Sequence, residues 1–137
     1  MNTNVFQIDP ELKKSIRKFR TKRSKNHTAL LIRIDEEKLL IEEDELIEDV
    51  NLDEFCNDLP DVDPRYILLS YNRVHEDGRL SNPLIFICYI PEGIPTQTTM
   101  LYSSAKNLVQ NESLINGKAL ELRDATDFDE DWLLSQI

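Results

Sequence analysis

The stretch His75-Glu76-Asp77-Gly78-Arg79 places an imidazole beside two carboxylates. A histidine near an acid can move protons, so His75 and Asp77 are the residues on which a hydrolase hypothesis would rest. Asp-Gly is also a strong turn signal, because glycine adopts a positive φ without steric cost. The chain has no GxSxG, HExxH, P-loop or GxGxxG motif to support catalysis. We therefore expect a polar turn between two strands and a protein that is not an enzyme.

Two further groups of residues raise the question of a metal. The run at 42–49 is acidic, but it lacks the alternating ligands and central glycine of an EF-hand loop, so we expect a solvated loop. Cys56 and Cys88 form no CxxC pair, and neither His27 nor His75 lies at zinc-ligand spacing from them. We expect two partly buried free thiols, no metal and no cofactor.

Charge is distributed unevenly along the chain. The net charge is −10, yet residues 1–27 contain eight of the 16 basic residues and only two acids. An acidic chain is a poor general binder of nucleic acid, because neutralising phosphates supplies most of that affinity. A basic patch on an acidic body suits an oriented protein partner better. The alternative is a nucleic-acid module at residues 13–25, which would show steep salt dependence.

The N-terminal basic residues fall on a predicted helix. Asp9-Pro10-Glu11 provides an N-cap acid, a proline at the first helical position and an acid in the first turn. Leu12, Ile16 and Phe19 follow at spacings of four and three, which predicts one apolar stripe and a helix to about residue 22.

The remaining elements alternate between strands and helices. Residues 28–34 and 38–43 predict a β-hairpin, 66–71 and 83–90 predict two buried strands, and 119–122 predict a short final strand. Helices are expected over 52–59 and over Thr96–Glu112. A closing helix follows a capping box at Thr126–Asp129 and is anchored by Trp132, Leu133 and Ile137. Because hairpin connections dominate, we predict an α+β fold, with a mixed sheet between helices and one domain over residues 1–137.

The sequence also bears on location. No apolar run approaches the ~20 residues of a membrane helix, and the first residues lack the basic and apolar regions of a signal peptide. We expect a cytoplasmic protein, extending to the nucleus, that does not bind membranes.

Over essentially its whole length the chain resembles the glia maturation factors, of the actin-depolymerising factor/cofilin homology (ADF-H) family. The resemblance rests on these segments: Arg17-Lys18-Phe19-Arg20, Asp58-Leu59-Pro60, Pro64-Arg65-Tyr66, Ser70-Tyr71, His75 to Arg79, Pro83-Leu84, Pro91-Glu92-Gly93, Met100-Leu101-Tyr102, Lys106, Leu108-Val109-Gln110 and Trp132-Leu133. It implies the gelsolin-like ADF-H fold, a central mixed sheet flanked by helices, which agrees with the independent prediction.

The resemblance also implies a function. In this family a helix with the pattern of Met100, Tyr102 and Lys106 enters the groove at the barbed end of actin or an actin-related protein. Cofilin-like members carry lysines just before the methionine, where this chain has Gln97-Thr98-Thr99. The resemblance therefore implies weak or no binding to actin alone. It implies binding to the actin-related protein 2/3 complex, inhibition of branched nucleation and debranching. The alternative is a cofilin-like protein that binds and severs actin.

Two contact surfaces follow from the resemblance, both on an expected monomer. The first combines the N-terminus with Arg17, Lys18, Arg20, Thr96, Gln97, Met100, Leu101, Ser103, Ser104 and Lys106. The second consists of His75, Glu76, Asp77 and Arg79, and is expected to contact the first actin subunit of the daughter filament. The N-terminal serine that is phosphorylated in some relatives is missing, and only Thr3 lies nearby.

Overall fold

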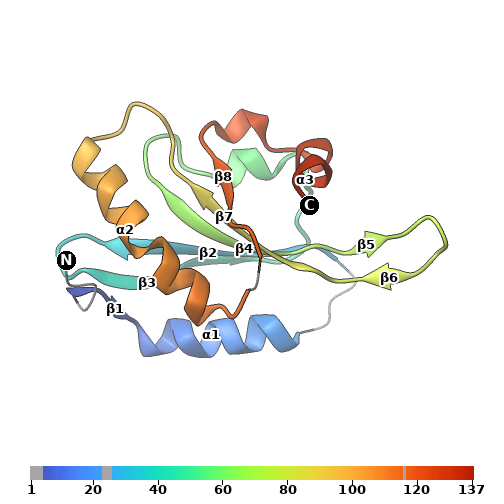
Figure 1. Ribbon diagram of the computed structural model, residues 1–137, viewed down its shortest axis with the longest axis horizontal. Helices are drawn as coiled ribbons and strands as arrows, with labels where there is room; N and C mark the ends of the chain where they lie inside the picture. Colours follow the sequence, from blue (N-terminus) through green and yellow to red (C-terminus); the bar gives the residue numbers. More distant parts are fainter. Residues whose placement is uncertain (1–4, 23–25, 116) are drawn as a thin grey trace.

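A six-stranded mixed sheet forms the centre of the structure (Figure 1). The computed structural model describes residues 5–22, 26–115 and 117–137. The strands lie in the order β1-β3-β2-β4-β7-β8, with β1 and β8 parallel to their neighbours and the other pairs antiparallel. Their bounds are β1 Gln7–Ile8, β2 Thr28–Asp35, β3 Leu40–Ile47, β4 Arg65–Ser70, β7 Leu84–Tyr89 and β8 Leu120–Leu122. The predicted mixed-sheet α+β fold is confirmed.

Two helices, α1 (Pro10–Thr21) and α2 (Thr96–Glu112), pack on one face of the sheet. The predicted cap of α1 is confirmed, since the Asp9 carboxylate accepts a hydrogen bond from the Glu11 amide. The predicted stripe is buried against alternate residues of the central strands. In α2, which has the predicted bounds, Tyr102, Ala105 and Val109 face the same core.

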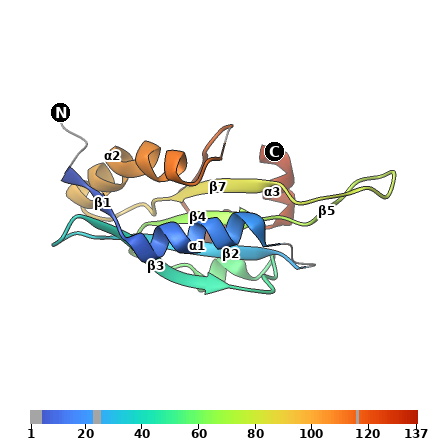
Figure 2. The same cartoon turned by 90° about the horizontal axis from the view of Figure 1, so that it is seen from below.

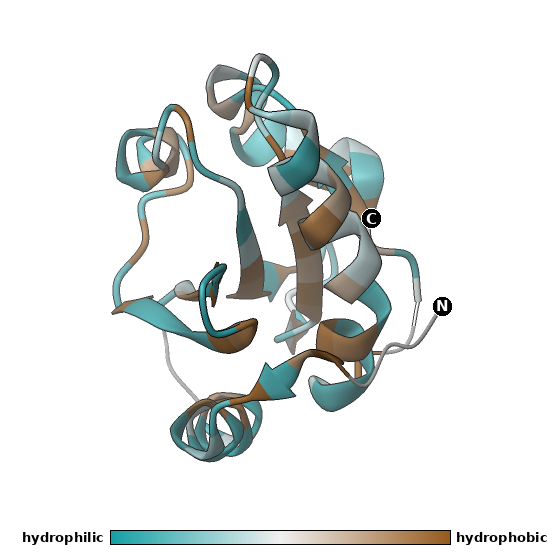
Figure 3. Cartoon of the chain, turned by 90° about the vertical axis from the view of Figure 1, so that its left-hand side faces the viewer, coloured by the Kyte–Doolittle hydropathy of each residue, from teal (hydrophilic) through white to brown (hydrophobic). Residues whose placement is uncertain are grey.

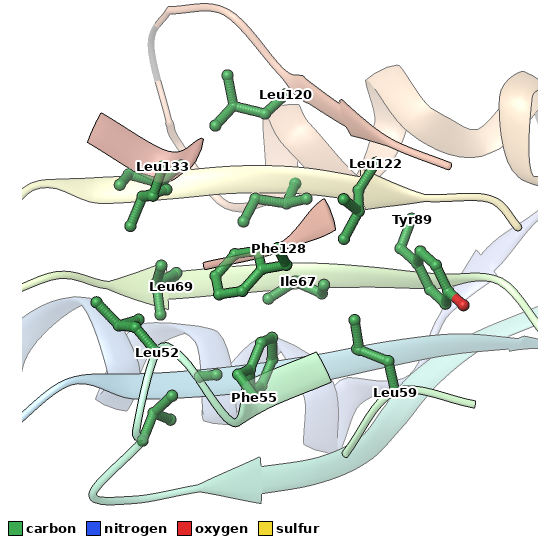
Figure 4. Packing of buried hydrophobic residues seen from close by; sticks show 14 of the residues in the cluster. Leu52, Phe55, Leu59, Ile67, Leu69, Tyr89, Leu120, Leu122, Phe128 and Leu133 are labelled. Carbon is green, nitrogen blue, oxygen red and sulfur yellow. The ribbon is translucent and has the colours of Figure 1, made fainter. Parts of the chain in front are cut away.

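The opposite face of the sheet is covered by short elements: the 3-10 helices η2 (Phe55–Asp58) and η3 (Ala125–Asp127), and the helix α3 (Glu130–Gln136). Figure 4 shows Phe55, Phe128 and Leu133 converging on Ile67 and Leu69 of β4. The Phe55 and Phe128 rings meet edge to face, with centroids 5.2 Å apart. The sheet therefore lies between two apolar layers, as the sequence predicted.

The acidic run forms a strand, and the predicted solvated loop at 42–49 is wrong. β3 extends to Ile47 and pairs with β2 along its length, with a bulge at the Leu31/Ile32 step. Glu43, Asp44 and Glu45 are exposed. The carboxylates obscured the strand because a strand near a sheet edge needs apolar residues on one face only. Charges along such a strand discourage pairing with other chains.

Other predictions at element ends were also wrong. The helix over 52–59 is only the 3-10 turn η2. The closing helix is capped by Asp129, whose carboxylate accepts from the Trp132 amide, while Thr126 belongs to η3. Leu133 is buried and Trp132 packs against the core, but Ile137 is 43% exposed and only lines a surface hollow. The predictions used local signals, whereas the observed ends of these elements are set by long-range packing that cannot be read from the sequence.

A second, two-stranded sheet projects from one end of the molecule. Its strands, β5 (Arg73–Val74) and β6 (Leu80–Ser81), flank the turn predicted from Asp77-Gly78, and both strands escaped prediction. Figures 1 and 2 both place this hairpin at one end of the long axis, and the start of α2 and the β2–β3 turn at the other. Within the described residues no helix is long and apolar enough to cross a membrane.

Candidate functional site

The inner face of α2 is attached to the sheet by two tyrosines. The Tyr102 hydroxyl accepts a hydrogen bond from the backbone amide of Ile34 at 2.9 Å, at the end of β2. The Tyr66 hydroxyl, from β4, donates to the Tyr102 carbonyl, and the two rings lie 5.3 Å apart. Burial raises the pKa of both tyrosines, so both hydroxyls keep their protons. This inner face holds the helix in place and leaves the outer face to interact.

The outer face of α2 presents one large apolar side chain. Met100 is 63% exposed, and four other residues predicted as contacts surround it on exposed positions. They are Thr96, Gln97, Ser103 and Ser104. Leu101 is half-buried and packs against the core, so less of it is available to a partner than of Met100. An exposed methionine on a rigid helix is the kind of group that inserts into a partner's apolar groove.

Lys106 lies at one side of this face and is partly enclosed. Its Nζ atom is 3.9 Å from Glu121 Oε1 of β8, and its side chain is 30% exposed. It lines a small hollow with Cys88, Thr99 and Ser103. Burial raises the pKa of the Cys88 thiol to about 11, so this cysteine stays protonated and unreactive. Both Cys56 and Cys88 are free thiols, as predicted.

The β2–β3 turn touches the first turn of α2, a contact that the sequence did not reveal. Thr98 Oγ1 donates to Glu36 Oε1 at 3.2 Å, although the residues are 62 positions apart. Figure 3 looks onto the end of the molecule that contains this contact. No sequence motif marks the contact, because it depends on how α2 crosses the end of β2.

The basic residues of α1 are exposed, but they do not adjoin the first turns of α2. Arg17, Lys18 and Arg20 form no ion pair within the described residues. Arg20 lines a hollow with Leu80 and Asn82 at the base of the hairpin. Figures 1 and 2 show the C-terminal half of α1 toward the hairpin end. The structure thus separates these residues from Met100. Residues 1–4 and 23–25, which include Thr3, lie outside the described residues.

At the tip of the hairpin, His75 and Asp77 each bond to a different residue. His75 Nε2 lies 2.9 Å from the Ser81 hydroxyl, whereas Asp77 binds the Arg79 amide at 3.0 Å and the Arg79 Nε at 2.6 Å. Gly78 takes the positive φ, 88°, that the turn requires. Glu76 is exposed. These contacts brace a hairpin, and none of them joins His75 to Asp77 as the hydrolase hypothesis required.

The base of the hairpin is held by groups from three parts of the chain. The Tyr71 hydroxyl donates to Glu130 Oε2 of α3 at 2.8 Å, and the Asn72 amide donates to His27 Nδ1 at 3.0 Å. The rings of His27 and Tyr71 stack with centroids 5.1 Å apart. Burial, with the Glu130 hydrogen bond, raises the pKa of Tyr71 to about 12, and burial lowers the pKa of His27.

Among the described residues no group of three or more His, Cys, Asp and Glu is arranged to hold a metal ion.

A helix fixed by its inner face, with an exposed methionine outside, fits a binding protein better than a catalyst. Residues 5–137 match the family model described as cofilin/tropomyosin-type actin-binding protein. The chain belongs to this family, in the branch of the glia maturation factors. The description of this family is that of an actin-binding protein.

The similarity to glia maturation factors covers nearly the whole chain. Glia maturation factor of Drosophila melanogaster is 33% identical over 136 residues, which cover 99% of this chain and 98% of the relative. Human glia maturation factor beta is 37% identical over 134 residues, covering 97% and 93%. The solution structure of glia maturation factor from Caenorhabditis elegans superposes with a TM-score of 0.83 at 34% identity, covering 97% and 96%. The family predicted from the sequence is confirmed.

Proposed function

We propose that this protein binds the actin-related protein 2/3 complex, inhibits branched nucleation and promotes debranching, acting in the cytoplasm at cortical actin structures. The observation that carries the proposal is the two-sided α2: Tyr102 is fixed in the core while Met100, two residues earlier, is 63% exposed. A preordered helix loses little conformational entropy on docking, so its one apolar side chain can contribute fully to binding.

The charge at the start of α2 supports the complex over actin filaments as the main partner. Positions 97–99 are uncharged, and the nearest charged contact of this turn is the Glu36 carboxylate. A docking helix whose first turn carries no cation gains little there from an acidic actin surface, especially at cellular salt, where exposed charges interact over only ~8 Å.

The hairpin supplies a second contact surface at the far end of the molecule. Val74 and Leu80 are 69% and 76% exposed, and the hollow beside them is lined by His75, Arg79 and Leu134 of α3. Because this hairpin and the start of α2 lie at opposite ends, one molecule can contact two subunits at once (Figure 1). In this proposal the hairpin contacts the first actin subunit of the daughter filament.

Debranching then needs no bond cleavage. A protein that binds one conformation of the branch complex more tightly shifts the population toward that conformation. If that conformation binds the daughter filament less tightly, binding of this protein lowers the affinity of the complex for the daughter filament, and branches are lost.

The test is fluorescence microscopy of preformed branched networks, counting daughter filaments lost over time after addition of the purified protein. Wild type should accelerate their loss. Met100→Asp should weaken binding to the complex about tenfold or more, because a carboxylate would be buried in an apolar groove. Asn111→Asp adds the same charge at an exposed position near the other end of α2 and should behave as wild type.

Cosedimentation with pure actin filaments separates the two candidate functions. We expect little wild-type protein in the pellet at physiological salt. Strong pelleting, together with unchanged branch lifetimes, would identify a cofilin-like filament-binding protein and contradict the proposal.

A further inference from the structure

Four charged side chains surround the first turn of α2. A small hollow beside Thr98 is lined by Arg33, Glu36, Asp63 and Arg65, which come from the end of β2, the β2–β3 turn and the start of β4. The β2–β3 turn and the start of α2, which both line this hollow, lie at the same end of the molecule (Figure 3).

Both arginines of the hollow are engaged by other carboxylates. Arg33 Nε lies 3.4 Å from Glu42 Oε2, and Arg65 Nε lies 2.9 Å from Asp44 Oδ2. The Arg65 side chain is only 12% exposed, so its charge is largely enclosed. Within the described residues Glu36 has no ion pair, and its carboxylate bonds to the neutral Thr98 hydroxyl. The start of α2 therefore has an excess negative charge.

The position of that charge is fixed by the fold. Asp35 Oδ1 accepts from the amides of Glu37 and Lys38 at 3.1 and 3.3 Å, which closes the β2–β3 turn. The Tyr102 hydroxyl, bonded to Ile34 just before this turn, holds α2 against it. Glu36 is consequently held next to α2, while Glu37 is an exposed neighbour whose amide bonds to Asp35 rather than to the helix.

We infer that Glu36 determines the specificity of the α2 docking surface, by which we mean the outer face of α2 around Met100. We further infer that the partner presents a lysine or arginine to the start of this helix. The inference rests on the proposed function and specifies in addition that the partner is basic where it meets the start of α2. A cation on the partner would pair with a carboxylate that has no ion pair within the described residues, whereas an acidic partner surface would be repelled at the same point. Such a charge at the rim of an interface mainly selects the partner and speeds association.

The experiment compares Glu36→Lys with its matched control Glu37→Lys, an equal charge change one residue away. Affinity for the purified actin-related protein 2/3 complex is measured at several salt concentrations. Glu36→Lys should bind about fivefold more weakly, since one exposed ion pair becomes a repulsion, and the difference should shrink as salt rises. Glu37→Lys should bind within about twofold of wild type. Thr98→Val, which removes the hydroxyl that positions Glu36, should give a smaller loss of the same kind.

The outcomes separate this inference from the proposed function. Equal binding by the two lysine variants, or tighter binding by Glu36→Lys, overturns the role of Glu36. If Met100→Asp still reduces binding in the same assay, the proposed function survives that result. Absence of wild-type binding to the complex overturns both. Circular dichroism measures the melting temperatures of all three variants, which we expect to be unchanged. A loss of affinity then arises at the interface and not from unfolding.

Discussion

The two ends of the molecule are attached to the sheet in different ways. At the α2 end, Tyr66 and Tyr102 connect the helix to β4 and β2 through buried hydrogen bonds, and a whole helical face is in the core. At the hairpin end, the contacts of Tyr71 and Asn72 hold only the base, and Val74 and Leu80 beyond it are largely exposed. This difference indicates that α2 is held along its length, whereas the hairpin is held only at its base and can adjust more easily. In the proposed function α2 is therefore the preformed contact surface and the hairpin the adjustable one.

The strongest test of this difference removes an attachment of α2. Tyr102→Ala should lower the free energy of unfolding by about 3–5 kcal/mol, because a buried ring is lost and the Ile34 amide is left without its partner. Urea denaturation measures this change. Ser103→Ala, on the exposed side of the same turn, should stay within about 0.5 kcal/mol. A loss below about 1 kcal/mol for Tyr102→Ala would mean that α2 is not held by its inner face.

The next test asks whether the basic residues near the C-terminal end of α1 make specific contacts with the partner. Arg17→Ala with Lys18→Ala should weaken binding to the complex several-fold and leave the free energy of unfolding within about 0.5 kcal/mol, because both side chains are exposed. The double variant Lys13→Ala and Lys14→Ala removes the same charge from the start of the helix. If the two pairs weaken binding equally, α1 contributes general attraction rather than specific contacts.

Gly78→Ala tests how much the hairpin contributes to stability. Gly78 has a φ of 88°, and a Cβ at this position would meet no heavy atom of the described residues within 4 Å, so the cost of an alanine is one of backbone strain alone. We expect a loss of about 1 kcal/mol in the free energy of unfolding. Glu76→Ala, exposed in the same turn, is the control and should change stability little. A loss of about 3 kcal/mol or more, the size expected for a core truncation, would show that the hairpin is a structural element comparable to α2.

The sequence predicted the two long helices well because their signals are local. The proline of α1 directly follows the Asp9 cap, and α2 was predicted with its observed bounds. The strand at 42–47 depends on pairing with β2, which no local signal encodes. The same reason explains why the two-residue strands β1, β5 and β6 were missed.

The candidate site was predicted by residue type but not by arrangement. Met100 and Tyr102 were both named from the family pattern, but the prediction did not say that Met100 faces the solvent and Tyr102 the core. The helical spacing of Tyr102, Ala105 and Val109 could have indicated the buried side. Glu36 could not have been found, because its contact with Thr98 joins two elements that meet only in the folded chain.

The smallest expected effect concerns His27 at the hairpin base. Burial lowers its pKa below the ordinary value of 6.5, and Glu130 only partly offsets this. A base with a lowered pKa in the folded state stabilises the fold in its neutral form, above pH 6.5, and this stability is lost as the pH falls below 6.5. Protonation at Nδ1 would also remove the acceptor of the Asn72 amide.

The melting temperature of wild type should therefore fall slightly more between about pH 7.5 and about pH 5.5 than that of His27→Gln, whose amide oxygen can still accept a hydrogen bond. His75→Gln is the control, because His75 lies at the tip of the hairpin and its ring bonds to the Ser81 hydroxyl rather than to the base. An equal pH response in all three proteins would mean that the hairpin base tolerates a charged His27. The hairpin base would then be held by contacts that do not depend on the charge of His27, such as those of the Tyr71 hydroxyl with Glu130 and of the Tyr71 amide with the Pro83 carbonyl.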